Sequence, residues 1–396
     1  MAREQPANVI AGAKSLWSDI HQCAQVAASN AFHLPWRTFA AVTGIGFSIL
    51  LVFIQLGFLN TAQKAVTRLY GDCHFDLAIV SRDYQFLCEA GSFDRIHLSQ
   101  AHALAGITAT FGLNTDYATW TDPKTELKSS LMLIGLDPDR AFIIDPDIRA
   151  GFPVLRKGRR AIIDSLSHKD YGALAIGGDG LINGFTIDVT GHFQLGMFFF
   201  SDGSAIVDNS EFTRLTRRNR RRISIGLIRL AEGANPERVA NALRRSLPED
   251  VLVYTKKNLI AQEQDYFISA RPVGILFRIG VFISYLVGMV ILYQVLATDI
   301  ANHIREFATL KAMGFGTRFI YGIGIMQAVL LVSMSFIPTL PTVYGVFEMV
   351  SMLSPMPVAM TPALILTVCG LALTMALISA LLALVKTRRA DPAELF

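Results

Sequence analysis

Four long runs of apolar residues divide the chain. Residues 38–63 (TFAAVTGIGFSILLVFIQLGFLNTAQ), Ile279–Thr298 and Ala363–Val385 contain no charged side chain. Another run, Phe319–Phe347, is longer and contains Pro338 and Pro341, so we expect its helix to kink or end there. Because about 20 apolar residues cross the hydrocarbon core as a helix, the pattern predicts four transmembrane helices.

The basic residues of the short flanks predict the orientation of these spans. They are Arg3, Lys14 and Arg37 before the first span, Arg305, Lys311 and Arg318 after the second, and Lys386, Arg388 and Arg389 after the fourth. The connection between the third and fourth spans has no Lys or Arg. Since Lys and Arg are retained on the cytoplasmic side, both termini and the connection after the second span are expected in the cytoplasm.

This orientation gives a complete domain order. It is a cytoplasmic segment (1–37), a first span (38–63), a periplasmic domain (64–271), a second span (272–298), a cytoplasmic helix (299–318), a third span (319–347), a short periplasmic loop (348–362), a fourth span (363–385) and a cytoplasmic tail (386–396). Within the first segment, the apolar residues of 9–27 share one helical face. That face indicates either an amphipathic helix on the membrane surface or an ordinary helix packed on protein.

The segment outside the membrane mixes strand and helix patterns. Candidate strands are Phe75–Val80, Leu131–Ile134, Ala161–Asp164, Phe185–Val189, Ala205–Val207, Ile223–Leu230 and Val251–Tyr254. Asn235 and Pro236 are typical of the start of a helix, which should run to about Ser246. The predicted fold class is a polytopic α-helical membrane protein with a large α/β (α+β) periplasmic domain between helices 1 and 2.

Composition agrees with a membrane protein and argues against several other classes. The 396 residues are 52% hydrophobic and 17% charged, whereas soluble domains carry about 25% charged residues. The net charge of +4 is too small for a nucleic-acid-binding protein. No GxxxxGK[ST], HExxH or GxSxG motif is present, and His97 and His102 have a poor spacing for metal ligands, so we expect no catalytic, cofactor or metal site.

Three features of the sequence each allow two interpretations. Cys73 and Cys88 are either a disulfide, which an oxidising compartment permits, or two buried thiols. The basic run Arg217–Arg222 is either a solvated loop or a contact for anionic lipid headgroups or an acidic partner. Gly280, Ser284 and Gly288 repeat every four residues, which indicates either close helix packing or ordinary membrane-helix composition.

The connection after the second span contains a short amphipathic helix. Its apolar face consists of Ile300, Ile304, Phe307, Leu310 and Met313, and its polar face of Asn302, Arg305, Glu306 and Thr309. Gly314 is suited to end it. Such a helix either docks in a groove of a partner protein or rests on the bilayer, and polar-face charges of both signs favour the partner.

Residues 305–314 (REFATLKAMG) resemble the motif R-x-E-[IF]-A-x-L-K-A-[MI]-G of FtsX/MacB-type permeases, the type VII ABC transporters, without the spacer after Arg305. The ending Arg388–Glu394 and the order of one span, a large outer domain and three spans are similar to that family as well. Further segments resemble its DevC-like subgroup; they are residues 55–58, 76–81, 193–196, 202–203, 225–228 and 293–299.

The resemblance implies a non-enzymatic permease subunit of a bacterial inner-membrane exporter. It implies a homodimer that binds two ATPase subunits, which hold the ATP, together with membrane lipid, a periplasmic membrane-fusion adaptor and an outer-membrane channel. Movement of the spans would then be transmitted to the outer domain to export a lipid, glycolipid or other hydrophobic cargo. The ATPase contact would consist of Ile304, Arg305, Glu306, Phe307, Leu310, Lys311 and Gly314. An FtsX-like regulator of a cell-wall hydrolase and a receptor without an ATPase are the alternatives.

Overall fold

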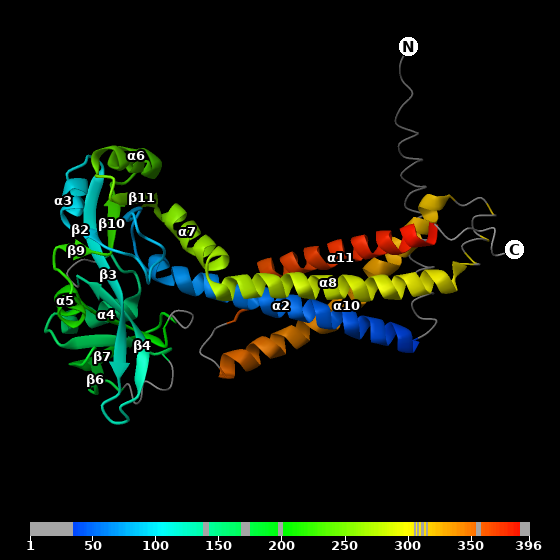
Figure 1. The fold of residues 1–396 in the computed structure, drawn as a ribbon, viewed down its shortest axis with the longest axis horizontal. Coiled ribbons are helices and arrows are strands. Elements are labelled where there is room, and N and C mark those ends of the chain that lie inside the picture. Colours follow the sequence, from blue (N-terminus) through cyan, green and yellow to red (C-terminus); the bar gives the residue numbers. More distant parts are fainter. Residues whose placement is uncertain are drawn as a thin grey trace, which may run out of the picture. The chain divides into compact units, whose positions relative to one another are not determined.

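The computed structural model describes residues 35–137, 142–167, 175–196, 201–304, 306, 309, 313, 316–353 and 358–388 (Figure 1). They divide into a helical unit, formed up to Phe58, by Leu276–Val350 and from Val358 on, and an outer domain that is mainly Leu59–Ile275. The predicted amphipathic helix at residues 9–27 lies outside the described residues.

The helical unit contains the four predicted membrane helices. They are α2 (Pro35–Gly71), α8 (Pro272–Asn302), α10 (Thr317–Leu353) and α11 (Pro362–Arg388). All four are long and apolar enough to span a membrane, with mean hydropathies between 2.0 and 2.5. The first is much longer than a bilayer requires, since its 37 residues measure about 55 Å at 1.5 Å per residue. The four predicted spans are therefore confirmed.

Helix α10 does not end at its prolines. It continues through Pro338 and Pro341 to Leu353, so residues 348–353, predicted in the loop, are helical. Hydroxyl groups near the prolines donate to carbonyl oxygens one turn back, from Thr339 to Ser335 at 2.7 Å and from Thr342 to Pro338 at 2.9 Å. Such side-chain bonds are one way in which membrane helices keep proline within the hydrocarbon core.

The outer domain is built on one nine-stranded sheet. Its strands are β1 (Leu77–Ser81), β3 (Ile107–Thr121), β4 (Lys128–Leu136), β5 (Arg160–Asp164), β6 (Asp179–Ile182), β7 (Phe185–Phe193), β8 (Gly203–Asp208), β10 (Ile225–Leu230) and β11 (Val251–Thr255). The order is β11-β1-β10-β3-β4-β8-β5-β7-β6, and β2 (Phe93–Asp94) pairs separately with β9 (Arg222–Ile223).

The long strand β3 joins two parts of this sheet. Its first half pairs with β10 and its second half with β4, while Trp120 and Thr121 also pair with β6. Because β6 is the last strand of the order, this pairing closes six strands into a ring. Trp120 packs so tightly inside that a Cβ on Gly180 would lie 2.0 Å from its ring, so only glycine fits at position 180.

A split β-α-β unit forms the other end of the sheet. Helix α6 (Pro236–Ser246) connects β10 to β11, and β1 lies between these two strands and is antiparallel to both. The Asn235 side chain accepts a hydrogen bond from the Arg238 amide at 3.2 Å, so the predicted helix start is confirmed. The remaining helices of the domain are α3 (Ile96–His102), α4 (Pro146–Leu155), α5 (Asn209–Thr216) and α7 (Lys256–Ser269).

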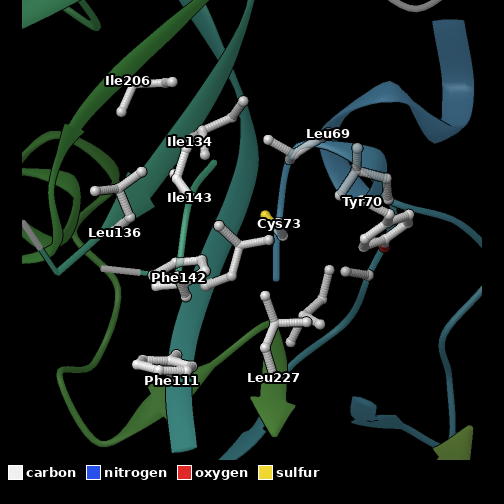
Figure 2. Close-up of a cluster of buried hydrophobic side chains, with 14 of the residues drawn as sticks. Leu69, Tyr70, Cys73, Phe111, Ile134, Leu136, Phe142, Ile143, Ile206 and Leu227 are labelled. Carbon is white, nitrogen blue, oxygen red and sulfur yellow. The ribbon is translucent and has the colours of Figure 1, made fainter. Parts of the chain in front are cut away.

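The largest apolar cluster gathers side chains from the end of α2 and from several strands. Figure 2 shows Leu69, Tyr70 and Cys73 beside Phe142, Ile134 and Leu227. The rings of Phe111 and Phe142 stack with their centroids 4.8 Å apart. The end of the first membrane helix is thus buried in the core of the outer domain.

Cys73 and Cys88 are free cysteines in the structure, which favours two buried thiols over a disulfide. Both thiols are buried in the same apolar cluster, as the alternative interpretation requires. Burial raises the pKa of the Cys73 thiol to about 12 and raises that of Cys88 as well. Both cysteines therefore stabilise the core as small apolar side chains.

Candidate coupling and transmission sites

A buried carboxylate joins the two ends of the outer domain that continue into membrane helices. Glu263 on α7 is fully buried and accepts hydrogen bonds from the Tyr84 hydroxyl and, at 3.2 Å, from the Leu87 amide. The Tyr84 hydroxyl lies 2.6 Å from that of Tyr70, on the last turns of α2. The network therefore links α2, the loop after β1 and α7.

The electrostatics of this network follow from its burial. Desolvation raises the pKa of Glu263 to about 7, and the hydrogen bonds from Tyr84 and Leu87 oppose the shift because they stabilise the charged form. Burial also raises the pKa of the Tyr84 hydroxyl, which keeps it a donor to the carboxylate. Glu263 consequently titrates near neutral pH.

Arg271 fixes the same loop from the start of the next helix. Its guanidinium lies 2.6 Å from the Glu89 carboxylate and 4.2 Å from the centre of the Phe86 ring. The Tyr266 hydroxyl donates to Gln85 at 2.6 Å. The loop from Tyr84 to Glu89 is therefore held by contacts with α7 and with the residues that lead into α8.

In the helical unit, a polar contact lies at the end of α8. Gln327 on α10 donates to the Asp299 carboxylate at 2.7 Å, and a ring nitrogen of His303 lies 2.9 Å from the Asp299 carbonyl oxygen. Gln327 is only 2% exposed. Sequence reasoning missed this contact, although a glutamine within an apolar span was a signal for it.

The predicted coupling helix is described only in part. Ile304 is half-buried, Glu306 and Met313 are exposed, and the Met313 amide donates to the Thr309 carbonyl at 3.0 Å, as in a helix. Five predicted contact residues lie outside the described residues; they are Arg305, Phe307, Leu310, Lys311 and Gly314. Glu306 is thus the one charged residue of the predicted set that the structure describes.

The structure brings Gly280, Ser284 and Gly288 into a helix contact. A Cβ on Gly280 would lie 2.6 Å from Gln55 of α2, and one on Gly288 would lie 2.6 Å from the Met375 sulfur of α11. The buried Ser284 hydroxyl donates to the Gly280 carbonyl at 2.8 Å. This face of α8 therefore packs closely on α2 and α11.

Replacing Gly288 with leucine should destabilise the helical unit by about 1–3 kcal/mol, because the new side chain has no space beside Met375. The thermal stability of the full chain in detergent, followed by size-exclusion chromatography after heating, measures this effect. Gly370→Leu on α11 is the matched control, since a Cβ there meets nothing within 4 Å. Equal losses for the two variants would contradict the packing explanation.

Two family models match the chain. The model of the MacB-like periplasmic core domain matches residues 38–246, and that of the FtsX-like permease C-terminal domain matches residues 278–392. The first alone covers more than half of the 396 residues. The chain belongs to the FtsX/MacB-type permease family.

Solved structures of periplasmic and extracellular domains of other proteins are similar to this chain at low sequence identity. The periplasmic region of MacB from Actinobacillus actinomycetemcomitans is 10% identical, with 50% of this chain and 95% of that chain covered and a TM-score of 0.36. The extracellular domain of the transporter YknZ from Gram-positive bacteria is 14% identical, with 46% and 98% covered and a TM-score of 0.31. No curated protein matches the chain.

Membership in this family of ABC permeases makes the chain a multi-pass membrane protein of a group that generally works with ATPase partners and is typically not catalytic. His97, one of the two histidines singled out in the sequence, makes contacts within the outer domain. Its ring nitrogens lie 3.0 Å from Gln100 and 3.3 Å from Asp250. Among the residues that the structure describes, no cluster of His, Cys, Asp or Glu could hold a metal ion.

Much of the basic run Arg217–Arg222 is engaged within the domain of this FtsX/MacB-type permease. Arg218 lies 2.9 Å from the Asp116 carboxylate, and Arg222 donates to the Ser92 hydroxyl at 2.9 Å. Arg217 lies over the Phe185 ring at 6.0 Å. These contacts within the domain favour a surface loop over a contact for anionic lipid headgroups or an acidic partner.

Proposed function

We propose that the chain is the permease subunit of an ATP-driven exporter, bound as a homodimer in the bacterial inner membrane with both termini in the cytoplasm. A separate ATPase, a periplasmic adaptor and an outer-membrane channel complete the machine. The cargo is a lipid, glycolipid or other hydrophobic compound, as the DevC-like segments imply. Family membership supports the permease role, and the mechanism is mechanotransmission.

The Tyr70–Tyr84–Glu263 network is the observation that carries the mechanism. Helix α2 is continuous from Pro35 to Gly71, so the first span and Tyr70 belong to one helix. Helix α7 ends at Ser269 and α8 begins at Pro272, so Glu263 lies close in sequence to the second span. A displacement of either span along its axis would therefore act on one buried network, which couples the spans to the sheet.

The distribution of charged residues in the four membrane helices argues against a polar channel and favours helices that transmit movement. Most ionisable residues of the four helices lie near the helix ends; they are Arg37, Lys64, Arg68, Arg278, Asp299, Arg318, Glu348, Lys386 and Arg388. A path for a polar cargo through the bilayer is normally marked by charged side chains inside the spans. The spans therefore show no path for a polar cargo. For the hydrophobic cargo proposed above, we place the transport step at the outer domain because that domain contains the buried network on which the spans act.

Glu306→Lys tests the proposed ATPase contact. Because Glu306 is exposed in the connection after α8, reversing its charge should leave the fold intact and repel a basic partner surface. We expect ATPase stimulation and export to fall about tenfold, which corresponds to about 1.4 kcal/mol of lost coupling. The measurement is ATP hydrolysis by the reconstituted complex with and without cargo.

Glu348→Lys is the matched control, with the same charge change on an exposed residue of α10 in the predicted periplasmic part. It should leave ATPase stimulation unchanged. Normal stimulation in Glu306→Lys would overturn the assignment of this connection as the ATPase contact.

A further inference from the structure

The nine-stranded sheet has one free edge in the part of the chain that the structure describes. At one end, β6 pairs with β3 and closes the ring, so no edge remains there. At the other end, β11 is the last strand and pairs with β1 alone. An unprotected edge strand is a template for a strand from another chain.

Alternation along β11 determines which backbone groups face the open side. The Arg82 amide donates to the Asp250 carbonyl and the Lys256 amide donates to the Asp76 carbonyl, both at 2.9 Å. Even-numbered residues from 250 to 256 therefore direct their amides and carbonyls to β1. The backbone groups of Val251 and Val253 are directed to the open side.

A basic cleft of about 530 Å³ follows this edge. Arg82 and Arg244 contribute side chains to its lining, together with Glu249 and residues of β11 itself. Arg244 donates to the Val253 carbonyl at 2.7 and 3.1 Å, and Arg82 donates to the Glu249 carbonyl at 3.4 Å. The two guanidinium groups are thus bound to backbone carbonyls, and a carboxylate would satisfy their charge better.

We propose that the β11 edge binds an extended, carboxylate-bearing segment of a periplasmic partner protein by strand addition. The Val251 amide and carbonyl and the Val253 amide supply main-chain hydrogen bonds, and Arg82 and Arg244 select acidic side chains. In the free protein Arg244 covers the Val253 carbonyl, which limits pairing with arbitrary strands. Two copies of this basic cleft would repel each other, so charge favours a different, acidic chain over a second copy.

This inference rests on the proposed function and deepens it, because the adaptor is the partner that such an exporter meets outside the membrane. Different experiments test the two proposals, so either can be rejected without the other. The Glu306→Lys experiment and co-purification of the ATPase and adaptor test the exporter, whereas the following tests concern the β11 edge.

Photocrosslinking in the native membrane identifies the occupant. The probe is p-benzoylphenylalanine in place of Glu249 in the full chain, and the control carries it in place of the exposed Glu232, which is not part of the cleft. We expect an adduct only at position 249, with a periplasmic segment that is rich in Asp and Glu. An adduct with a second copy of this chain, with lipid or with a neutral segment, or no specific adduct, would overturn the proposal.

Hydrogen exchange then distinguishes strand addition from ordinary docking. A synthetic peptide of the captured segment is added to the full chain in nanodiscs, and exchange is resolved by residue. The amides of Val251 and Val253 should exchange about tenfold more slowly, while those of Leu252 and Tyr254, already directed to β1, should not change. Equal protection of both sets, or of neither, would reject strand addition.

Charge reversal tests the role of the two arginines. The double variant Arg82→Glu/Arg244→Glu should weaken binding of the same peptide by about a hundredfold, because two attractions become repulsions. Arg220→Glu/Arg238→Glu changes the net charge equally at exposed positions outside the cleft and should weaken it less than about threefold. Similar losses in both double variants would reject specific recognition by Arg82 and Arg244.

Discussion

Glu263→Ala is expected to destabilise the outer domain by about 3 kcal/mol or more. The change leaves the Tyr84 hydroxyl and the Leu87 amide buried without their acceptor, and each such group costs about 1–3 kcal/mol. The vacated space adds a cavity cost. Thermal unfolding of the full chain in nanodiscs measures the loss, and the exposed Glu232→Ala is the control that should change little.

The same carboxyl should make stability depend on pH. Its pKa is raised from 4.5 to about 7 in the folded domain, so folding favours the protonated form. The resulting stabilisation is fully present below pH 4.5 and is lost as pH rises through 7, and a difference of about 2.5 pKa units corresponds to about 3 kcal/mol.

Glu263→Gln isolates this contribution from that of other groups. The pKa of buried Asp164 is also raised, mainly by desolvation, so wild type and variant share a background slope of the same sign. The variant keeps the size of the side chain and one acceptor but cannot titrate. Its stability should therefore fall less between pH 4.5 and 7 than that of the wild type, and identical slopes would contradict titration of Glu263.

The parts of the fold that sequence predicted are those encoded by local patterns. Membrane helices are recognisable because their apolar runs are far longer than any strand. The start of α6 was recognisable from Asn235 and Pro236, whose capping and backbone preferences act within one turn.

The sequence pattern did not predict β3, the longest strand, because polar residues interrupt it. Gly112, Asn114 and Asp116 interrupt the apolar alternation of β3. Asn114 is buried because its side-chain amide donates to Asn209 at 2.8 Å, a partner supplied only by the folded chain. Tertiary contacts thus satisfy polar groups that a local pattern assigns to a loop.

The candidate site was predicted only where it is continuous in sequence. The coupling segment has a recognisable motif, whereas the buried network joins Tyr84 to Glu263 across 179 positions. Glu263 lies four positions from both Leu259 and Phe267, so the helical period places it on the apolar face of α7, but no local pattern identifies its partner Tyr84. Long-range pairing of this kind becomes visible only when β1, α2 and α7 are brought together.

Deleting residues 65–268 and joining the ends with a flexible linker should abolish export and adaptor binding while membrane insertion and ATPase binding remain. The deletion removes Tyr70 and Glu263, so movement of the spans no longer reaches a folded domain. Helix α2 up to Lys64 and helix α8 still exceed the roughly 20 residues that a span needs.

The measurements are co-purification of the ATPase, co-purification of the adaptor and cargo export from cells. Glu306→Lys in the full chain is the complementary variant, because it should keep adaptor binding and lose ATPase stimulation. If the deletion loses adaptor binding alone and Glu306→Lys loses ATPase stimulation alone, the contacts with the adaptor and with the ATPase lie in different parts of the chain, as mechanotransmission requires. Export by the shortened chain would mean that the spans themselves carry the cargo path, and the outer domain would then have no part in moving the cargo.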